Sequence, residues 1–93
     1  MSVELKDAKR MMRKFNINPK VIKPREFKKA MEIELEHGSQ IPLTNVTGDN
    51  LELTAKIALA HIIEYVDYYK RLIRMEKQAE KFWEGKIKPS IFL

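Results

Sequence analysis

The chain has 93 residues, with 18 lysines and arginines, 13 aspartates and glutamates, and no cysteine. This length suits one domain with a single modest core and is too short for a second domain or a deep enclosed substrate cavity. The lack of cysteine excludes disulfides, thiolate zinc sites and cysteine nucleophiles. The first residues lack the layout of a secretion signal, and no apolar run approaches the ~20 residues of a membrane span. We therefore expect an intracellular protein that makes no membrane contact.

The net charge of +5 is unevenly distributed along the chain. Residues 1–29 carry ten basic and three acidic side chains, residues 30–67 one and seven, and residues 68–93 seven and three, which gives +7, −6 and +4. Basic ends of this kind could contact phosphates without sequence specificity, or they could be solvated helix faces balanced by the acidic middle. The residues that we expect at a phosphate-contacting surface are Arg10, Arg13, Lys14, Arg25, Lys28 and Lys29.

Two helices are predicted in the first half of the chain. Apolar residues at helical spacing predict the first helix from about residue 5 to residue 15, ending at residues 16–18. The second helix begins at Pro24, which suits the first helical position, and Ile22 can pack against Phe27 across its start. Its apolar stripe includes Phe27, Met31 and Leu35, and Gly38 is predicted to close it.

A third and much longer helix is predicted from Leu51 to Trp83 or Glu84, ended by Gly85. Thr47 is predicted to cap its start. This helix carries two adjoining apolar faces, which suits a central helix covered by the first two helices, or one that also contacts a second copy of the chain. The predicted fold is therefore all-α, a small three-helix bundle with a long central C-terminal helix. Residues 1–85 form the domain and residues 86–93 an extended tail that folds back or docks into a partner.

Both histidines lie beside carboxylates at helical spacing. Glu34 and His37 are three residues apart on the second helix, and His61 and Glu64 are three apart on the third. Residues at this spacing share a helix face, so the four together could bind Fe, Mn or Zn if the two helices are adjacent. Glu76 falls on the apolar face of the long helix but about 22 Å from His61 along the axis, too far to join that site.

The alternative to a metal is a buried hydrogen-bond network without a cofactor. Glu34 lies within the apolar stripe of its helix, and a buried carboxylate needs a hydrogen-bond partner. Histidine and tyrosine on the long helix could supply it, and acid–base catalysis by the same groups is a third interpretation. The residues expected in this network are Glu34, His61, Tyr65, Tyr68, Tyr69 and Glu76. No complete catalytic motif or phosphate-binding glycine loop occurs in the chain, so we predict no catalytic residues.

Four runs of sequence resemble a known family. They are ELEHG, TNVTGDN, TAKIALAH and EYVDYYKRLIRME, in this order between Glu34 and Glu76. In this combination they resemble a family of small uncharacterised all-helical domains of bacteriophages, large DNA viruses and bacteria. The resemblance implies a small intracellular domain, in the host cytoplasm or virion if viral, with no assigned activity. The family form has a proline before the aspartate of DYY where this chain has Val66, and this difference favours an unbroken long helix.

These observations favour a non-enzymatic helical module that acts through protein contacts. We expect a protein partner or self-association, and a role as a structural or accessory component of a viral or phage assembly. The alternatives are a metal-binding helical protein that uses Glu34, His37, His61 and Glu64, and non-specific nucleic-acid binding through the basic N-terminal helices.

Overall fold

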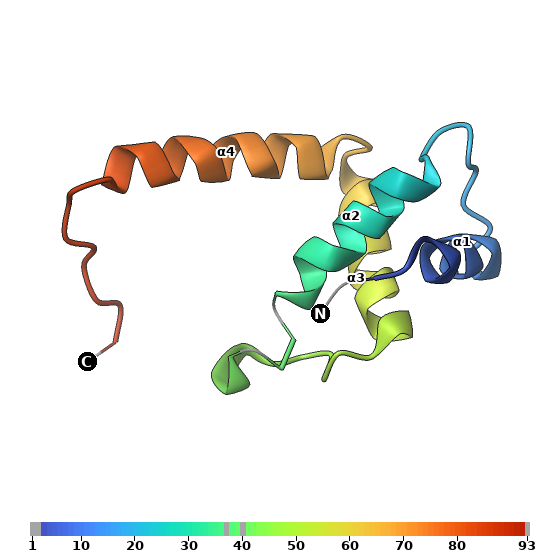
Figure 1. Ribbon diagram of the computed structural model, residues 1–93, viewed down its shortest axis with the longest axis horizontal. Helices are drawn as coiled ribbons and strands as arrows, with labels where there is room; N and C mark the ends of the chain where they lie inside the picture. Colours follow the sequence, from blue (N-terminus) through green and yellow to red (C-terminus); the bar gives the residue numbers. More distant parts are fainter. Residues whose placement is uncertain (1–2, 37, 40, 93) are drawn as a thin grey trace.

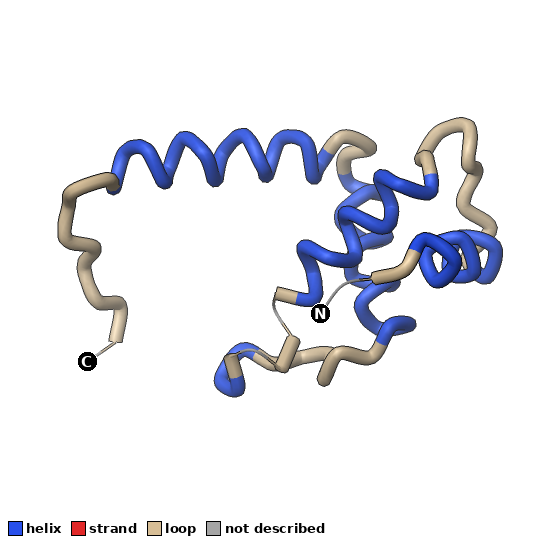
Figure 2. Tube along the Cα trace, viewed as in Figure 1, coloured by secondary structure: helices blue, strands red, loops and turns tan. Residues whose placement is uncertain are grey.

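The computed structural model describes residues 3–36, 38–39 and 41–92, and this part of the chain contains helices and no strands (Figure 2). The four α-helices are α1 (Leu5–Lys14), α2 (Pro24–Leu35), α3 (Leu51–Glu64) and α4 (Tyr68–Trp83). A short 3-10 helix, η1 (Pro42–Thr44), lies in the connection between α2 and α3. The all-α prediction is thus confirmed for the described residues.

The first three helices form a compact body with α2 at its centre, because α2 packs against both α1 and α3 (Figure 1). Phe27 and Met31 of α2 have no exposed surface and form the middle of the core. Burying side chains of this size contributes roughly 1.5–3 kcal/mol each. The predicted central helix was the long C-terminal one, and this assignment is wrong. The remaining core residues are Val3, Ala8, Met11, Met12, Ile22, Ala30, Ile33, Leu35, Ala55, Ala58 and Tyr69.

Local signals define the start of α2 as predicted. Pro24 occupies the first helical position, and the Lys23 backbone N–H donates to Glu26 Oε1 over 3.4 Å. Ile22 and Phe27 are both buried at this end of the helix. Since proline has a helical φ and no backbone donor to satisfy, it costs little at this position.

The cap of α3 differs from the prediction. Asn50, and not Thr47, caps the helix, because the Asn50 side chain accepts from the Leu53 backbone N–H at 3.0 Å. Thr47 is buried three residues earlier in the loop. Both residue types cap helices well, so the local sequence did not distinguish them.

The predicted single helix from Leu51 to Trp83 is also wrong, because the chain leaves the helical conformation after Glu64. Tyr65 is extended, with φ −142° and ψ 120°, and α4 starts again at Tyr68 in a new direction (Figure 1). Tyr65 and Val66 are aromatic and β-branched residues with only moderate helix propensity. The absence of proline at Val66 therefore did not ensure a continuous helix.

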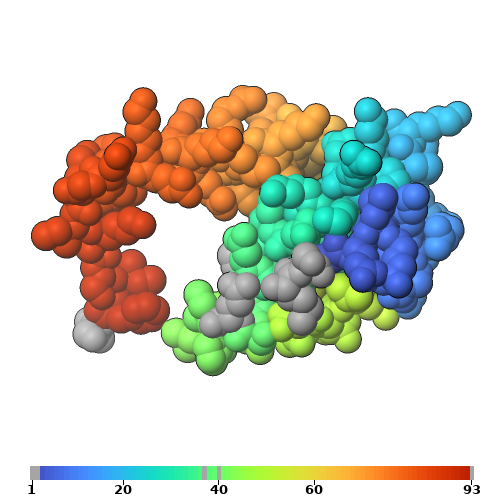
Figure 3. Space-filling view, viewed as in Figure 1, coloured from blue at the N-terminus to red at the C-terminus, as the bar shows by residue number. Residues whose placement is uncertain are grey.

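α4 projects away from the body, and residues 86–92 continue from its end without helical structure (Figures 1 and 3). Tyr69 is the only buried residue of α4. The helix ends at Trp83, and Gly85 follows with φ +73°, a left-handed conformation that favours glycine, so the predicted end is confirmed. In the tail, Ile87 is 96% and Ile91 87% exposed, and the Lys86 ammonium lies over the ring of Phe82. Among the described residues, no helix combines the length and apolar character needed to cross a membrane.

Candidate functional site

Three polar side chains from three helices meet where α4 joins the body. Glu34, on the last turn of α2, is only 5% exposed, and its Oε2 accepts a 2.6 Å hydrogen bond from the Tyr69 hydroxyl of α4. His61 of α3 completes the group, because its Nδ1 lies 3.2 Å from the Tyr69 hydroxyl and 3.2 Å from Glu34 Oε2. We call Glu34, His61 and Tyr69 the polar trio. It gives the buried Glu34 carboxylate a hydrogen bond from Tyr69 and places His61 Nδ1 near the same oxygen.

The bend between α3 and α4 assembles this group. His61 and Tyr69 are eight residues apart, which in an unbroken helix would separate them by about 12 Å along the axis. The bend at residues 65–67 instead returns Tyr69 to the side of α3 on which His61 and Glu34 lie. A single helix could not have placed all three side chains together.

Aromatic contacts hold the imidazole of His61 in place. Its ring stacks on Tyr68, with centroids 4.4 Å apart and planes at 5°, and meets the edge of Tyr69 at 6.1 Å. Tyr68 and Tyr69 contact each other edge-to-face at 5.0 Å. An edge-to-face pair such as Tyr68–Tyr69 contributes about 0.5–1.5 kcal/mol beyond burial. Together these contacts hold the His61 ring in the orientation that directs Nδ1 toward the Glu34 carboxylate.

The polar trio is a hydrogen-bonded group that joins α2, α3 and α4. Burial and the neighbouring Glu34 carboxylate raise the pKa of Tyr69, so the phenol stays protonated and acts as a donor. Because the Tyr69 hydroxyl donates its proton to Glu34, His61 Nδ1 can bond the Tyr69 oxygen only as an N–H donor. The Glu34 side chain thus accepts from Tyr69 and lies beside His61 at the junction of three helices.

Tyr68 contacts this group through its ring, whereas Tyr65 and Glu76, also predicted for the network, lie apart from it. Tyr65 is 63% exposed at the bend. Glu76, predicted to need a partner on a covered apolar face, is instead exposed on the projecting part of α4. This placement follows from the bend, which turns the second half of the predicted helix away from the body.

The proposed metal ligands are only partly brought together. Glu34 and His61 are neighbours, whereas Glu64 is exposed at the end of α3. His37 lies outside the described residues. Within the part of the chain that the structure describes, no group of three or more histidine and carboxylate side chains is arranged to bind a metal ion.

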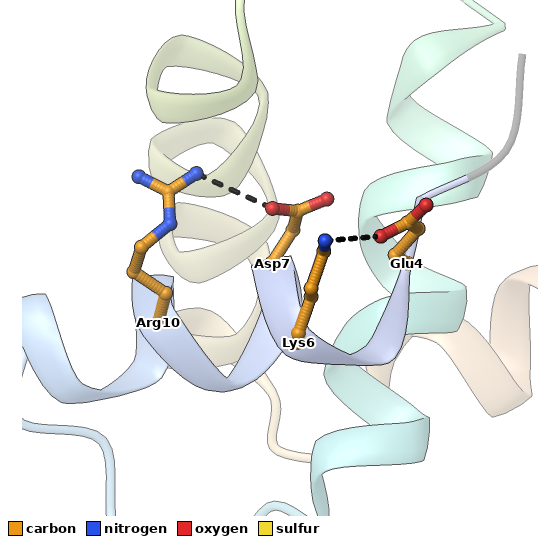
Figure 4. Close-up of polar contacts among 4 residues, drawn as sticks. All are labelled: Glu4, Lys6, Asp7 and Arg10. Carbon is orange, nitrogen blue, oxygen red and sulfur yellow. Dashed lines mark hydrogen bonds and ion pairs between the residues drawn. The ribbon is translucent and has the colours of Figure 1, made fainter.

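The basic residues predicted to contact phosphate divide into two sets. Arg10 pairs with Asp7 at 3.4 Å on α1, where Lys6 also pairs with Glu4 (Figure 4). Lys14 pairs with Glu52 of α3 at 2.8 Å, and Lys28 pairs with Glu32 at 3.0 Å. The other three predicted residues, Arg13, Arg25 and Lys29, are exposed. Surface pairs such as these contribute about 0–1 kcal/mol each and neutralise part of the basic surface.

A groove that the sequence analysis did not predict lies beside the bend. It has a volume of about 560 Å³, and its lining includes the apolar side chains of Ile22, Ile62 and Ile73. The exposed Lys29 and Lys70 also line it. Residues of α2, α3 and α4 all line the groove, so the groove forms only because the chain bends between α3 and α4. No local sequence signal could have indicated it. The other lining residues are Val21, Lys23, Arg25, Glu26, Val66, Asp67 and Tyr69.

The fold and site therefore define a small all-helical domain with a buried glutamate–tyrosine–histidine group and a projecting C-terminal helix. A family model described as a protein of unknown function, DUF5661, matches residues 8–78, and the chain belongs to this family. The matched region begins within α1 and ends within α4. No curated protein and no solved structure matches the chain.

Proposed function

We propose that the chain is a non-enzymatic helical module that acts by binding protein through α4 and the segment that follows it. The observation that carries this proposal is the exposed apolar surface of the projecting helix. Met75 is 57% and Phe82 58% exposed on α4, and Phe92 is 66% exposed in the tail. Met75 and Phe82 are seven residues apart and so lie on one face of α4, and apolar surface left uncovered in this way is typical of a protein interaction site.

The polar trio supports this proposal by anchoring α4. Tyr69 is the one buried residue of the helix, and its hydroxyl reaches Glu34 across the junction with the body. A helix held at its first turns presents its later turns at a defined angle, which reduces the entropy lost when a partner binds. The trio is then a positioning device for the interaction surface.

We also propose that the module works within a phage or viral assembly. This proposal is supported by four runs of sequence that resemble small all-helical domains of bacteriophages, large DNA viruses and bacteria. The runs are ELEHG, TNVTGDN, TAKIALAH and EYVDYYKRLIRME. A tagged chain expressed during infection should co-purify with particles or their precursors. Its uniform absence from them would contradict this part of the proposal.

Comparative co-purification tests the interaction itself. The wild-type chain and a Met75→Glu/Phe82→Glu variant, each tagged at its N-terminus, are purified from the native host, and bound proteins are identified by mass spectrometry. Because both side chains are exposed, the variant should remain folded, and circular dichroism checks this. We expect the variant to lose a protein that the wild type binds, or to lose self-association.

A matched control changes Glu80, which is also exposed on α4, to Lys. This variant should retain the same contacts, since the substitution changes charge but leaves the apolar side chains in place. The proposal is contradicted if the wild-type chain is monomeric at every accessible concentration and binds no protein that the Met75→Glu/Phe82→Glu variant loses.

A further inference from the structure

The groove beside the bend lies on the opposite side of α4 from the exposed apolar residues of the later turns. Lys70 and Ile73 line the groove from α4. Met75 and Phe82 lie about 160–180° around the helix from Ile73, because successive residues are turned by about 100°. The groove is therefore a second surface, separate from the one through which we propose that α4 binds protein.

The apolar lining of the groove is left partly uncovered by the chain itself. Val21, which precedes α2, is 60% exposed, and Val66, at the bend, is 58% exposed. Ile62 of α3 and Ile73 of α4 are half-buried. These side chains line one hollow instead of standing singly on the surface, and apolar surface gathered in this way is typical of a binding site.

Four cationic side chains also line the groove. Lys23, Arg25 and Lys29 come from the start of α2 and the residue before it, and Lys70 comes from α4. All four are exposed. In the part of the chain that the structure describes, none of them forms an ion pair with a carboxylate. Their charges are thus available to a ligand in the groove.

The two carboxylates in the lining already have partners within the chain. Asp67 Oδ2 accepts from Arg71 Nε over 2.8 Å, and Glu26 Oε1 accepts from the backbone N–H of Lys23 over 3.4 Å. Neither carboxylate forms an ion pair with a cation of the lining among the described residues. A ligand therefore meets four positive charges and two negative ones beside an apolar surface.

We infer that the groove beside the bend binds an acidic amphipathic helix of a partner protein. The apolar side chains of that helix lie against Val21, Val66 and Ile73, and its carboxylates pair with Lys29 of α2 and Lys70 of α4. Helices α2 and α4 bound the groove, and a groove of this kind recognises a helix through apolar residues three or four positions apart. Charge complementarity selects an acidic partner. This inference goes beyond the proposed function, because the surface and the partner both differ.

Two other anionic ligands fit the groove less well. A small molecule such as a fatty acid is held where most of its surface is enclosed, whereas an acyl chain beside the exposed Val21 and Val66 stays in contact with water. A nucleic acid binds through phosphates and stacked bases. Tyr69, the aromatic residue of the lining, is 8% exposed, so little of its ring is available for stacking. A helix instead covers both valines and brings carboxylates to the lysines.

Fluorescence anisotropy with a synthetic peptide tests the inference on the full chain. The probe is a labelled peptide of about 14 residues, with leucines three and four positions apart and glutamates at most other positions. One control peptide has the same composition in an order that distributes the leucines over all faces, and another has lysine in place of glutamate. We expect the probe to bind at least about tenfold more tightly than either control.

Charge reversal tests whether the probe binds in the groove. Lys29→Glu/Lys70→Glu should weaken binding at least about tenfold, because two attractive contacts become repulsive. Lys77→Glu/Lys88→Glu is the matched control, since it makes the same change in net charge at exposed positions outside the lining. This control should bind the probe within about threefold of the wild type. Circular dichroism checks that both variants remain folded.

NMR locates the probe on the chain directly. The probe should shift the backbone amide signals of Val21, Val66 and Ile73 and leave those of residues 79–83 unchanged. Met75→Glu/Phe82→Glu, which alters the opposite side of α4, should bind the probe within about threefold of the wild type.

Several results would overturn the inference. It fails if the probe binds no more tightly than the control peptides, if the two lysine double variants weaken binding equally, or if the shifts fall on residues 79–83. It also fails if oleate or a single-stranded oligonucleotide binds the groove more tightly than the probe does. A wild-type chain that binds the probe in the groove, with no protein lost by Met75→Glu/Phe82→Glu, would support the inference and overturn only the proposed function.

Discussion

Replacing Tyr69 by Phe is the sharpest test of the polar trio. The substitution keeps the aromatic ring and removes only the hydroxyl that donates to Glu34 over 2.6 Å. Glu34 is 5% exposed, so its carboxylate cannot replace the lost donor fully with water. Hydrogen bonds to charged groups are worth about 1.5–3 kcal/mol, and we expect the free energy of unfolding to fall by about 2 kcal/mol.

For a domain of this size, each kcal/mol lowers the Tm by about 4–8 °C, so Tyr69→Phe should lower it by roughly 8–16 °C. Calorimetry and urea titration measure the two quantities. Tyr65→Phe is the matched control, because Tyr65 is 63% exposed and should change stability by no more than about 0.5 kcal/mol. The reasoning is refuted if both variants are as stable as the wild type, or if Tyr65→Phe costs as much as Tyr69→Phe.

Three further predictions concern pH, packing and metal. Because the pKa of Tyr69 is raised in the folded chain, the unfolded chain releases the phenol proton first, at about pH 10. The stability that Tyr69 contributes is therefore present below about pH 10 and is lost as the pH rises further. In urea titrations above pH 10, the free energy of unfolding should fall more steeply with pH for the wild type than for Tyr69→Phe. Equal dependence on pH in the two proteins would contradict this. At Gly38 an added Cβ would collide with the Asp49 carboxylate, so Gly38→Ala should cost about 1–3 kcal/mol. Asp49→Ala should relieve part of that cost in a double-mutant cycle, and strict additivity would show that the collision is unimportant. Finally, we expect the Tm to be the same with a chelator as with added Zn²⁺, Mn²⁺ or Fe²⁺. A rise in Tm of several degrees on adding one of these ions would instead indicate a metal site that includes Glu34.

Local sequence signals were sufficient for the helix ends that depend on one residue. Pro24 and Gly85 determine where α2 starts and α4 ends, because each restricts or permits backbone angles by itself. The burial of Glu34 could also be predicted, since its place in the apolar stripe of α2 follows from helical periodicity alone.

The bend between α3 and α4 could not be predicted in the same way. The apolar spacing continues through Tyr65 without interruption, so periodicity indicates one helix. The contact that the bend permits joins Glu34 to Tyr69, 35 residues away, and such tertiary contacts override local propensity. The positions of Glu76 and of the groove follow from the bend and were missed for the same reason.

Hydrogen exchange along α4 tests most directly whether this helix is an interaction surface. The chain is measured by mass spectrometry as a dilute monomer and again in the assembly recovered with it, or at concentrations where it self-associates. We predict that backbone amides between Met75 and Trp83 exchange more slowly in the assembled state, while those in the core of α2 stay unchanged, because binding covers only the projecting helix. Equal exchange of residues 75–83 in both states would contradict the account.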